Sequence, residues 1–207
     1  MLLSTRPLTT SLKTCIRPIT TTRAFTSTRI MSSGPSFADY GIENTNIKTA
    51  SGVELSQEQK VIVGSVLDLF AGRPSLKKLS LWKDDALFQD NITKAEGRKQ
   101  YEPQWYGLQS AFSAIERLHQ EVTSAGNPIE MDMKTKYTVK GVGMEQTIES
   151  KIKIWTEGGK IKEVQDRWNG ELPEGVFATA MRNLNSVTVP LFVGVPKNEE
   201  EDKKRGN

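Results

Sequence analysis

The fold is decided by residues 129–168, which read IEMDMKTKYTVKGVGMEQTIESKIKIWTEGGKIKEVQDRW. In residues 129–139 the odd positions are mostly apolar and the even positions are polar. After a Gly-Val-Gly turn the alternation resumes, with isoleucines at even positions. A period of two predicts strands with one buried and one solvent-exposed face, and glycine-bearing turns predict antiparallel neighbours. We therefore predict an antiparallel meander whose buried face is covered by helices from the rest of the chain.

The first 32 residues differ in composition from the rest of the chain. They are rich in Ser, Thr and Arg, and the first acidic residue of the chain is Asp39. Such a composition is typical of an organelle transit peptide, and Arg23 stands two residues before Phe25, as in mitochondrial processing sites. We predict a mitochondrial transit peptide over residues 1–32 and a location in the mitochondrial matrix. The alternative is a disordered tail, with translation starting at Met31.

Charge and composition exclude several classes of function. The chain has 28 Lys and Arg residues against 25 Asp and Glu residues. Five of the basic residues lie in residues 1–32, so the rest of the chain contains 23 basic and 25 acidic residues. The basic pI of about 8.9 therefore belongs to the predicted transit peptide and does not favour nucleic-acid binding. No apolar run is long enough for a membrane span.

Cysteine and histidine are nearly absent. Cys15 is the single cysteine and lies in the predicted transit peptide, while His119 is the single histidine. Disulfides, thiolate nucleophiles and multi-histidine metal sites are thus excluded for the mature chain. We expect no metal and no other cofactor.

The residues before the meander predict helices. Residues 33–54 lack periodicity and are interpreted as a linker or as an arm on the surface. Ser56 and Gln59 form a capping box for a helix that ends before Gly72. Ser75 caps a second, shorter helix reaching Trp82, and residues 86–90 form a short strand.

A third helix is expected over residues 97–108, where Pro103 is the difficulty. Proline removes a backbone donor from a helix interior, so the helix is either kinked there or a new helix begins at Pro103, which we favour. Residues 112–123 are predicted to be a strand with Leu118 and Val122 on one face and His119 on the exposed face. The domain ends at residue 172.

The carboxy-terminal part predicts an extension. Residues 173–196 contain a helix and a second apolar run, which are too apolar to remain in water. We expect these residues either to close a cavity as a lid or to form a subunit interface, and we favour their packing on the domain itself. Residues 197–207 are charged and are predicted to be disordered. The fold class is α+β, with helices on one face of a curved antiparallel sheet.

Three motifs carry a family resemblance. They are Trp-Lys-Asp-Asp-Ala-Leu-Phe-Gln-Asp at residues 82–90, Glu-Gly-Arg at residues 96–98, and the glycine-led strand of residues 158–168. In this order they resemble the nuclear transport factor two-like superfamily, in particular its SnoaL-like branch, over residues 55–172. The resemblance implies a cone-shaped sheet with a pocket at its wide end and homodimers formed through the outer sheet face. It implies no single activity, because members include isomerases, dehydratases, cyclases and non-catalytic binding proteins.

The inward-facing positions of such a cone predict the lining of a pocket. Its thioether and aromatic side chains suit a small apolar or carbonyl-bearing ligand, although ordinary core filling would produce the same pattern. The predicted ligand-binding residues are Trp105, Met131, Met133, Tyr137, Met144, Ile148, Ser150, Ile152 and Trp168.

The candidate catalytic residues are Asp166, Asp90 and Tyr101. If Val164 and Trp168 point inward, Asp166 points inward with them, and burial would raise its pKa to that of a general base. Ile161 lies at an odd position, whereas Val164, Asp166 and Trp168 lie at even positions. Ile161 and these three residues can therefore all point inward only if the strand contains a bulge. Asp90 is expected either to lie near the pocket mouth or to cap a loop. Tyr101 either donates a hydrogen bond to an oxyanion or packs against the sheet.

The sequence thus predicts a protein that encloses a small molecule, without identifying its activity. A cofactor-independent isomerase, dehydratase or cyclase that uses a pocket carboxylate is one alternative. A non-catalytic protein-interaction scaffold is the other.

Overall fold

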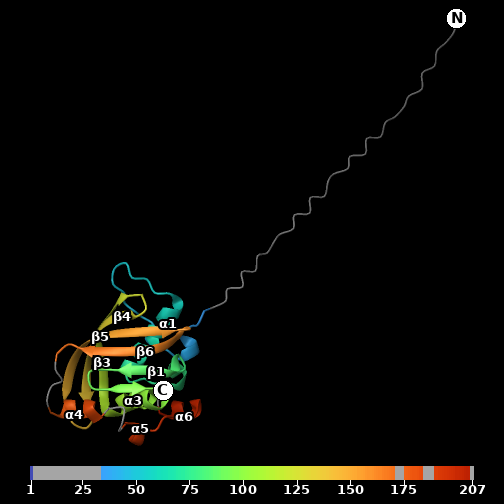
Figure 1. Cartoon of the computed structure of the whole chain (residues 1–207). Helices are drawn as coiled ribbons and strands as arrows, with labels where there is room; N and C mark the ends of the chain where they lie inside the picture. Colours follow the sequence, from blue (N-terminus) through green and yellow to red (C-terminus); the bar gives the residue numbers. More distant parts are fainter. Residues whose placement is uncertain (2–33, 171–174, 184–188, 206–207) are drawn as a thin grey trace. The chain divides into compact units, whose positions relative to one another are not determined.

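The computed structural model describes residues 1, 34–170, 175–183 and 189–205. The predicted transit peptide, apart from Met1, lies outside these residues. Residues 33–207 form one unit, built from a curved sheet with helices over its concave face (Figure 1). Among the described helices, none is long and apolar enough to cross a membrane.

The sheet has six strands in the order β2-β1-β6-β5-β4-β3. All neighbouring pairs are antiparallel except β1 and β6, which run parallel. The sheet is therefore mixed rather than purely antiparallel, and it is open, with β2 and β3 at its edges. The strands are β1 (Trp82–Gln89), β2 (Lys94–Glu96), β3 (Phe112–Ser124), β4 (Ile129–Val139), β5 (Glu145–Glu157) and β6 (Lys160–Trp168).

The predicted meander is confirmed as β4, β5 and β6. Along β4 the odd positions are buried and the even ones partly exposed, without exception. A two-residue turn, Gly158-Gly159, joins β5 to β6, and both glycines have positive φ values of 60° and 77°. This is the backbone conformation that tight hairpins require and that glycine adopts without steric cost.

The amino-terminal helices begin at the predicted caps. The Ser56 hydroxyl accepts from the Gln59 amide and the Gln59 side chain accepts from the Ser56 amide, so the capping box starts α1 (Gln57–Phe70). Ser75 caps α2 (Leu76–Leu79). This helix is shorter than predicted, because Trp82 already pairs with Ile161 as the first residue of β1. Pairing along the sheet thus overrides the helical spacing.

The prediction for Pro103 is wrong. α3 (Arg98–Ala111) is one continuous helix with Pro103 inside it. The proline leaves the carbonyl of Lys99, one turn earlier, without its helical donor. Lys99 is exposed, so solvent can satisfy that carbonyl.

The face predicted for Leu118 in β3 is also wrong. Arg117 pairs with Thr135 and His119 with Lys134, which leaves Leu118 as a bulged residue without a partner. Leu118 is 47% exposed whereas Val122 is fully buried, because a bulge reverses the alternation along a strand. His119 is exposed, as predicted.

Residues 34–55 are not a free linker. A short 3-10 helix, η1 (Ala38–Tyr40), precedes Ile42, which is buried. The backbone amides of Glu43 and Asn44 donate to the carboxylate of Asp68 on α1. The same carboxylate accepts from Arg73 and lies 3.1 Å from Lys78 Nζ. This buried cluster fastens the segment to the domain.

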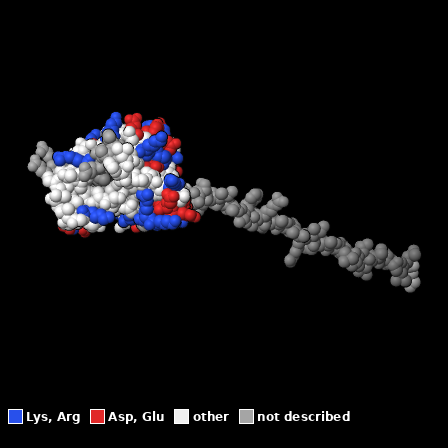
Figure 2. Space-filling model, turned by 90° about the horizontal axis from the view of Figure 1, so that it is seen from below, with Lys and Arg blue, Asp and Glu red and all other residues white. Residues whose placement is uncertain are grey.

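The carboxy-terminal extension, residues 173–196, contains α4 (Val176–Asn183) and α5 (Val189–Phe192), and α6 (Glu199–Lys204) follows it. α4 lies against the sheet with Phe177 and Met181 buried, whereas Leu191 and Phe192 of α5 are 75% and 84% exposed. Figure 2 shows a broad area without charged side chains on the face that carries these helices. The extension is thus partly packed and partly open to solvent.

The prediction of a disordered tail is wrong for residues 199–204. Asn198 caps α6, and Asp202 of this helix is buried. Its carboxylate accepts from the Tyr106 hydroxyl at 2.8 Å and from the Leu76 amide at 2.7 Å. A high charge content predicted disorder, but one buried aspartate with two donors holds the helix in place.

Candidate functional site

One cavity lies between the concave face of the sheet, α3 and α4. Its volume is about 40 Å³, which is large enough to admit water-sized groups. Most of the lining is apolar or aromatic, and a few polar groups converge on it, which is typical of small-molecule sites. The lining residues are Phe70, Phe88, Asp90, Gln104, Trp105, Leu108, Tyr137, Ile148, Asp166, Trp168 and Met181.

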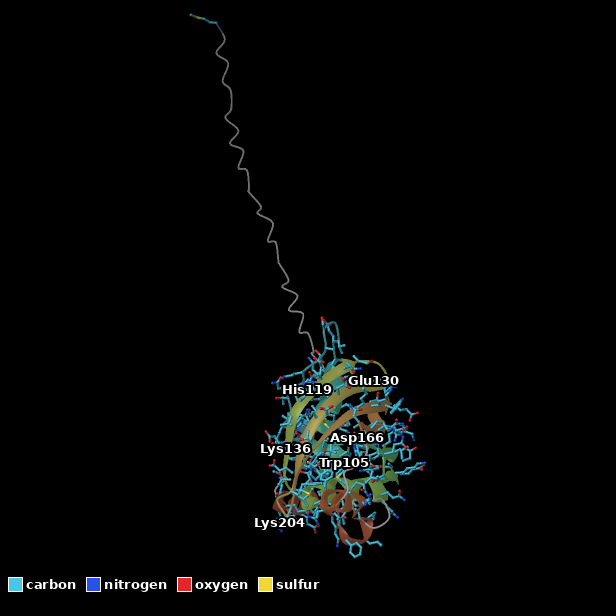
Figure 3. All side chains as sticks on the ribbon, turned by 90° about the vertical axis from the view of Figure 1, so that its left-hand side faces the viewer. Trp105, His119, Glu130, Lys136, Asp166 and Lys204 are labelled. Atoms are coloured by element: carbon cyan, nitrogen blue, oxygen red, sulfur yellow. The ribbon has the colours of Figure 1, made fainter. Side chains whose placement is uncertain are left out.

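Asp166 is the central polar group of this cavity. Its side chain is buried, and the Trp168 indole donates a 2.8 Å hydrogen bond to its Oδ2. Its Oδ1 makes no hydrogen bond of good geometry within the described part of the chain, although the Ser150 hydroxyl lies near enough to the carboxylate to lower its pKa. Burial, and to a lesser extent the nearby Asp90 carboxylate, raises the pKa of Asp166 to about 7, although the Trp168 hydrogen bond opposes this. Figure 3 shows Asp166 and Trp105 in the interior, with His119 and Lys136 on the outer side of the sheet.

A bulge in β6 turns Asp166 inward. Trp155 pairs with Glu163 and Thr156 with Ile161, so Lys162 has no partner on β5. Ile161, Val164, Asp166 and Trp168 are therefore all buried, although the first has the opposite parity to the other three. All four residues can face inward only if the strand contains a bulge, and the structure contains this bulge at Lys162.

Asp90 lines the same cavity and is half-buried, so it lies nearer to the surface. Its Oδ1 accepts from the amides of Ile92 and Thr93 at 2.8 and 2.6 Å. Burial raises the pKa of Asp90, while these two amides lower it. Asp90 is thus a loop cap that also contributes a carboxylate to the cavity.

Two donors in the lining have no hydrogen-bond partner among the residues that the structure describes. Gln104 Nε2 and Trp105 Nε1, neighbours on α3, are both buried and make no hydrogen bond among the described residues. Leaving such a buried donor unsatisfied costs about 1–3 kcal/mol. A bound molecule with an acceptor oxygen would satisfy them.

The structure does not bring Tyr101 to the cavity. Its ring stacks on Trp82 and its hydroxyl donates to the carbonyl of Lys83 at 3.0 Å. Tyr137 lines the cavity instead. Burial, followed by the nearby Asp166 carboxylate, raises the pKa of Tyr137, so its phenol stays protonated and able to donate a hydrogen bond. Tyr137, predicted only as a ligand-binding residue, is therefore the phenol of the site.

The other predicted ligand-binding residues divide into four groups. Trp105, Tyr137, Ile148 and Trp168 line the cavity. Met131 and Ile152 are fully buried core residues that do not reach it, and Met133 and Ser150 border a separate hollow with His119. Met144 is 37% exposed and precedes β5. It therefore lies in the turn between β4 and β5 and not on the buried face of the sheet.

The sequence interpretation missed five lining residues, namely Phe70, Phe88, Gln104, Leu108 and Met181. Four lie on helices and one on β1, so their approach to the cavity depends on packing between elements. The helical spacing of Gln104 and Leu108 was the available signal for a shared face.

The outer face of the sheet carries paired charges. Lys134 lies 2.7 Å from Glu149, and Lys153 lies 2.8 Å from Glu130. Opposite charges on facing strands are typical of a solvated sheet surface, and the predicted homodimer through this face stays a prediction. The described residues contain no group of three or more His, Cys, Asp or Glu able to hold a metal ion.

Comparisons with known proteins concern the fold. No protein-family model and no curated protein matches the sequence. Among solved structures, an NTF2-like protein from Anabaena variabilis matches with a TM-score of 0.50 and 12% identity, over 59% of this chain and 97% of that one. A putative isomerase from Bacillus subtilis has a TM-score of 0.45 and 16% identity over 55% of this chain and 90% of that one.

A putative polyketide cyclase from Silicibacter has a TM-score of 0.44 and 10% identity over 52% of this chain and 88% of that one. At such identities the likeness extends to the fold alone. The strand order, the helices over the concave face and the Anabaena match agree, so the chain has the fold of the nuclear transport factor two-like superfamily.

Proposed function

We propose that the cavity binds a small carbonyl-bearing molecule and that Asp166 transfers a proton next to its carbonyl group, without a cofactor. The observation that carries this proposal is the carboxylate of Asp166, which is buried in the lining of the cavity. Its Oδ1 makes no hydrogen bond of good geometry with any described residue, and the Ser150 hydroxyl interacts with the carboxylate only enough to lower its pKa in part. Buried polar atoms are almost always paired, so such an exception calls for an explanation.

The electrostatics favour proton transfer at neutral pH. A general base works best when its pKa lies near the working pH, since it must both accept and return the proton. Burial raises the pKa of Asp166 to about 7. Asp90, which is already occupied by two backbone amides, is the less suitable base and helps to tune Asp166.

The donors support the same chemistry. When a proton leaves a carbon beside a carbonyl group, negative charge develops on the carbonyl oxygen, and donors aimed at that oxygen stabilise it. Gln104 Nε2 supplies an N–H of this kind from α3. The protonated phenol of Tyr137 is a further donor in the lining.

Hydrogen–deuterium exchange of 2-butanone tests the proposal. In D₂O the wild-type protein is expected to accelerate loss of the α-proton signals in ¹H NMR. Asp166→Asn should reduce this acceleration by at least about 100-fold, the usual contribution of a general base.

Asp132→Asn is the matched control, because Asp132 is a partly exposed carboxylate on the opposite face of the sheet. The proposal fails if Asp166→Asn exchanges as fast as the wild type. It also fails if no acyclic ketone or aldehyde in a panel is exchanged by the wild-type protein.

We also propose that the protein acts in the mitochondrial matrix. The basic, acid-free composition of residues 1–32 supports this. A fluorescent protein fused behind residues 1–33 should enter mitochondria, and replacing the five basic residues by Gln should retain it in the cytosol. A diffuse cytosolic signal from the unaltered fusion contradicts the proposal.

A further inference from the structure

One wall of the cavity comes from the carboxy-terminal extension. Met181 of α4 borders the cavity and is 7% exposed. Phe177, one turn earlier on the same helix face, is fully buried. Its ring lies 6.0 Å from that of Phe112 and 6.2 Å from that of Tyr137. Phe177 therefore anchors α4 on the sheet, and the i, i+4 spacing places Met181 over the cavity.

The other walls are fixed more firmly. The ring of Trp105 lies 4.7 Å from that of Phe88 and 5.1 Å from that of Phe70. The Trp168 indole is held by its hydrogen bond to Asp166. Met181 has an unbranched side chain, and methionine adapts its shape to the space available.

The size of the cavity makes this wall decisive. A cavity that binds benzene measures about 150 Å³, whereas this one measures about 40 Å³. A six-membered ring is too wide for it, whereas a short chain can place its carbonyl end inside and its other end in the opening of the cavity, which is not fully enclosed. Truncating Met181 to alanine removes three non-hydrogen atoms from the wall, as a leucine-to-alanine change does in a packed core.

We propose that Met181 determines the specificity of the site, so that it takes short acyclic carbonyl compounds and excludes rings. The inference rests on the proposed use of the cavity as a ligand site. It assigns to α4 the role of a fixed wall that limits the length and width of the bound molecule.

Binding of benzene tests the wall independently of catalysis. The probe signals are the indole N–H resonances of Trp105 and Trp168 in ¹⁵N-correlated NMR spectra. In the wild type benzene should leave both unshifted, whereas in Met181→Ala it should shift both, with an affinity at least tenfold higher. Met181→Leu should behave as the wild type.

Val176→Ala is the matched control, because Val176 is on the same helix but 45% exposed. Met181→Phe, which fills the cavity, should abolish the indole shifts that 2-butanone causes in the wild type. This second variant keeps the test decisive if the alanine variant does not fold. Benzene binding of equal strength in the wild type and Met181→Ala overturns the inference, as does retained 2-butanone binding in Met181→Phe.

Exchange measurements separate this inference from the proposed function. Met181→Ala should raise the rate of cyclohexanone exchange relative to that of 2-butanone at least tenfold. If no variant exchanges any ketone but benzene binding follows the expected pattern, proton transfer is refuted and the size limit stands. If exchange depends on Asp166 but the ring-to-chain ratio is unchanged in Met181→Ala, the size limit is refuted and proton transfer stands.

Discussion

Replacing Asp68 by alanine is expected to lower the free energy of unfolding by about 3–5 kcal/mol, the usual cost of removing one partner from a buried ion pair. Asp68 is fully buried on α1. Its carboxylate accepts from Arg73 and from two backbone amides, and lies 3.1 Å from Lys78 Nζ.

The cost arises mainly from what remains after the substitution. Lys78 is only 3% exposed, and without Asp68 its charge would be buried without a counter-charge. The amides of Glu43 and Asn44 would also lose their acceptor, so residues 34–55 would be released from α1.

The protonation of Asp68 supports this expectation. Burial alone would raise its pKa, but the Arg73 hydrogen bond, the Glu43 amide and Lys78 together hold the pKa below its usual value. A depressed pKa in the folded state means that this stabilisation is present above the unfolded-state pKa and is lost as the pH falls through the folded-state pKa. Acid should therefore weaken the cluster.

Urea denaturation at neutral pH measures the effect. Asp85→Ala serves as the control, because Asp85 forms an exposed pair with Lys162, and such pairs contribute about 0–1 kcal/mol. A loss below about 1 kcal/mol for Asp68→Ala would show that the buried cluster does not hold the segment.

Replacing Asp166 by asparagine is expected to have the opposite effect on stability. Burial raises the pKa of Asp166 from 3.8 to about 7. The unfolded state loses its proton near pH 4, and the folded state only near pH 7. The protonated carboxyl of Asp166 therefore contributes its full stabilisation of the folded state below pH 4. This stabilisation is lost as the pH rises from 4 through 7. The total is about 4 kcal/mol, because each pKa unit corresponds to about 1.36 kcal/mol.

Asparagine does not ionise and can still accept from the Trp168 indole. Its amide would, however, place an unsatisfied donor in the cavity, which offsets part of the gain. We expect Asp166→Asn to be more stable than the wild type by about 2–4 kcal/mol at pH 8 and by clearly less at pH 5.

Urea denaturation of both proteins at the two pH values measures this difference. Asp132→Asn, on the outer face, should change stability by no more than about 0.5 kcal/mol. An Asp166→Asn variant that is less stable than the wild type at pH 8 would contradict the expectation, as would a difference independent of pH.

The two aspartates show why burial alone does not identify a functional site. Both are buried carboxylates. Asp68 has donors for both oxygens and a lowered pKa, whereas Asp166 has an oxygen without a well-formed hydrogen bond among the described residues and a raised pKa. The first stabilises the fold. The second destabilises it at neutral and alkaline pH, a cost expected of groups kept for chemistry.

Much of the site could be predicted from the buried face of the meander. Alternation together with the family resemblance predicts Tyr137, Ile148 and Trp168 in the lining, and all three border the cavity. Met131 and Ile152 have the same pattern but lie in the solid core, because alternation identifies a buried face and not the part of that face left uncovered by helices. Gln104 and Met181 come from helices whose packing is set by distant contacts.

The sequence by itself determined the local features of this protein. The capping box at Ser56, the Gly158-Gly159 hairpin and the alternation of β4 depend on interactions between residues close in the chain, so they can be read from spacing. Tertiary structure decided the bulge at Lys162, the continuity of α3 through Pro103, the docking of α6 through Asp202 and the presence of Met181 and Asp166 in the lining of one cavity. Each depends on the competition between backbone pairing, solvent access and side-chain packing across segments distant in sequence, which no local pattern records.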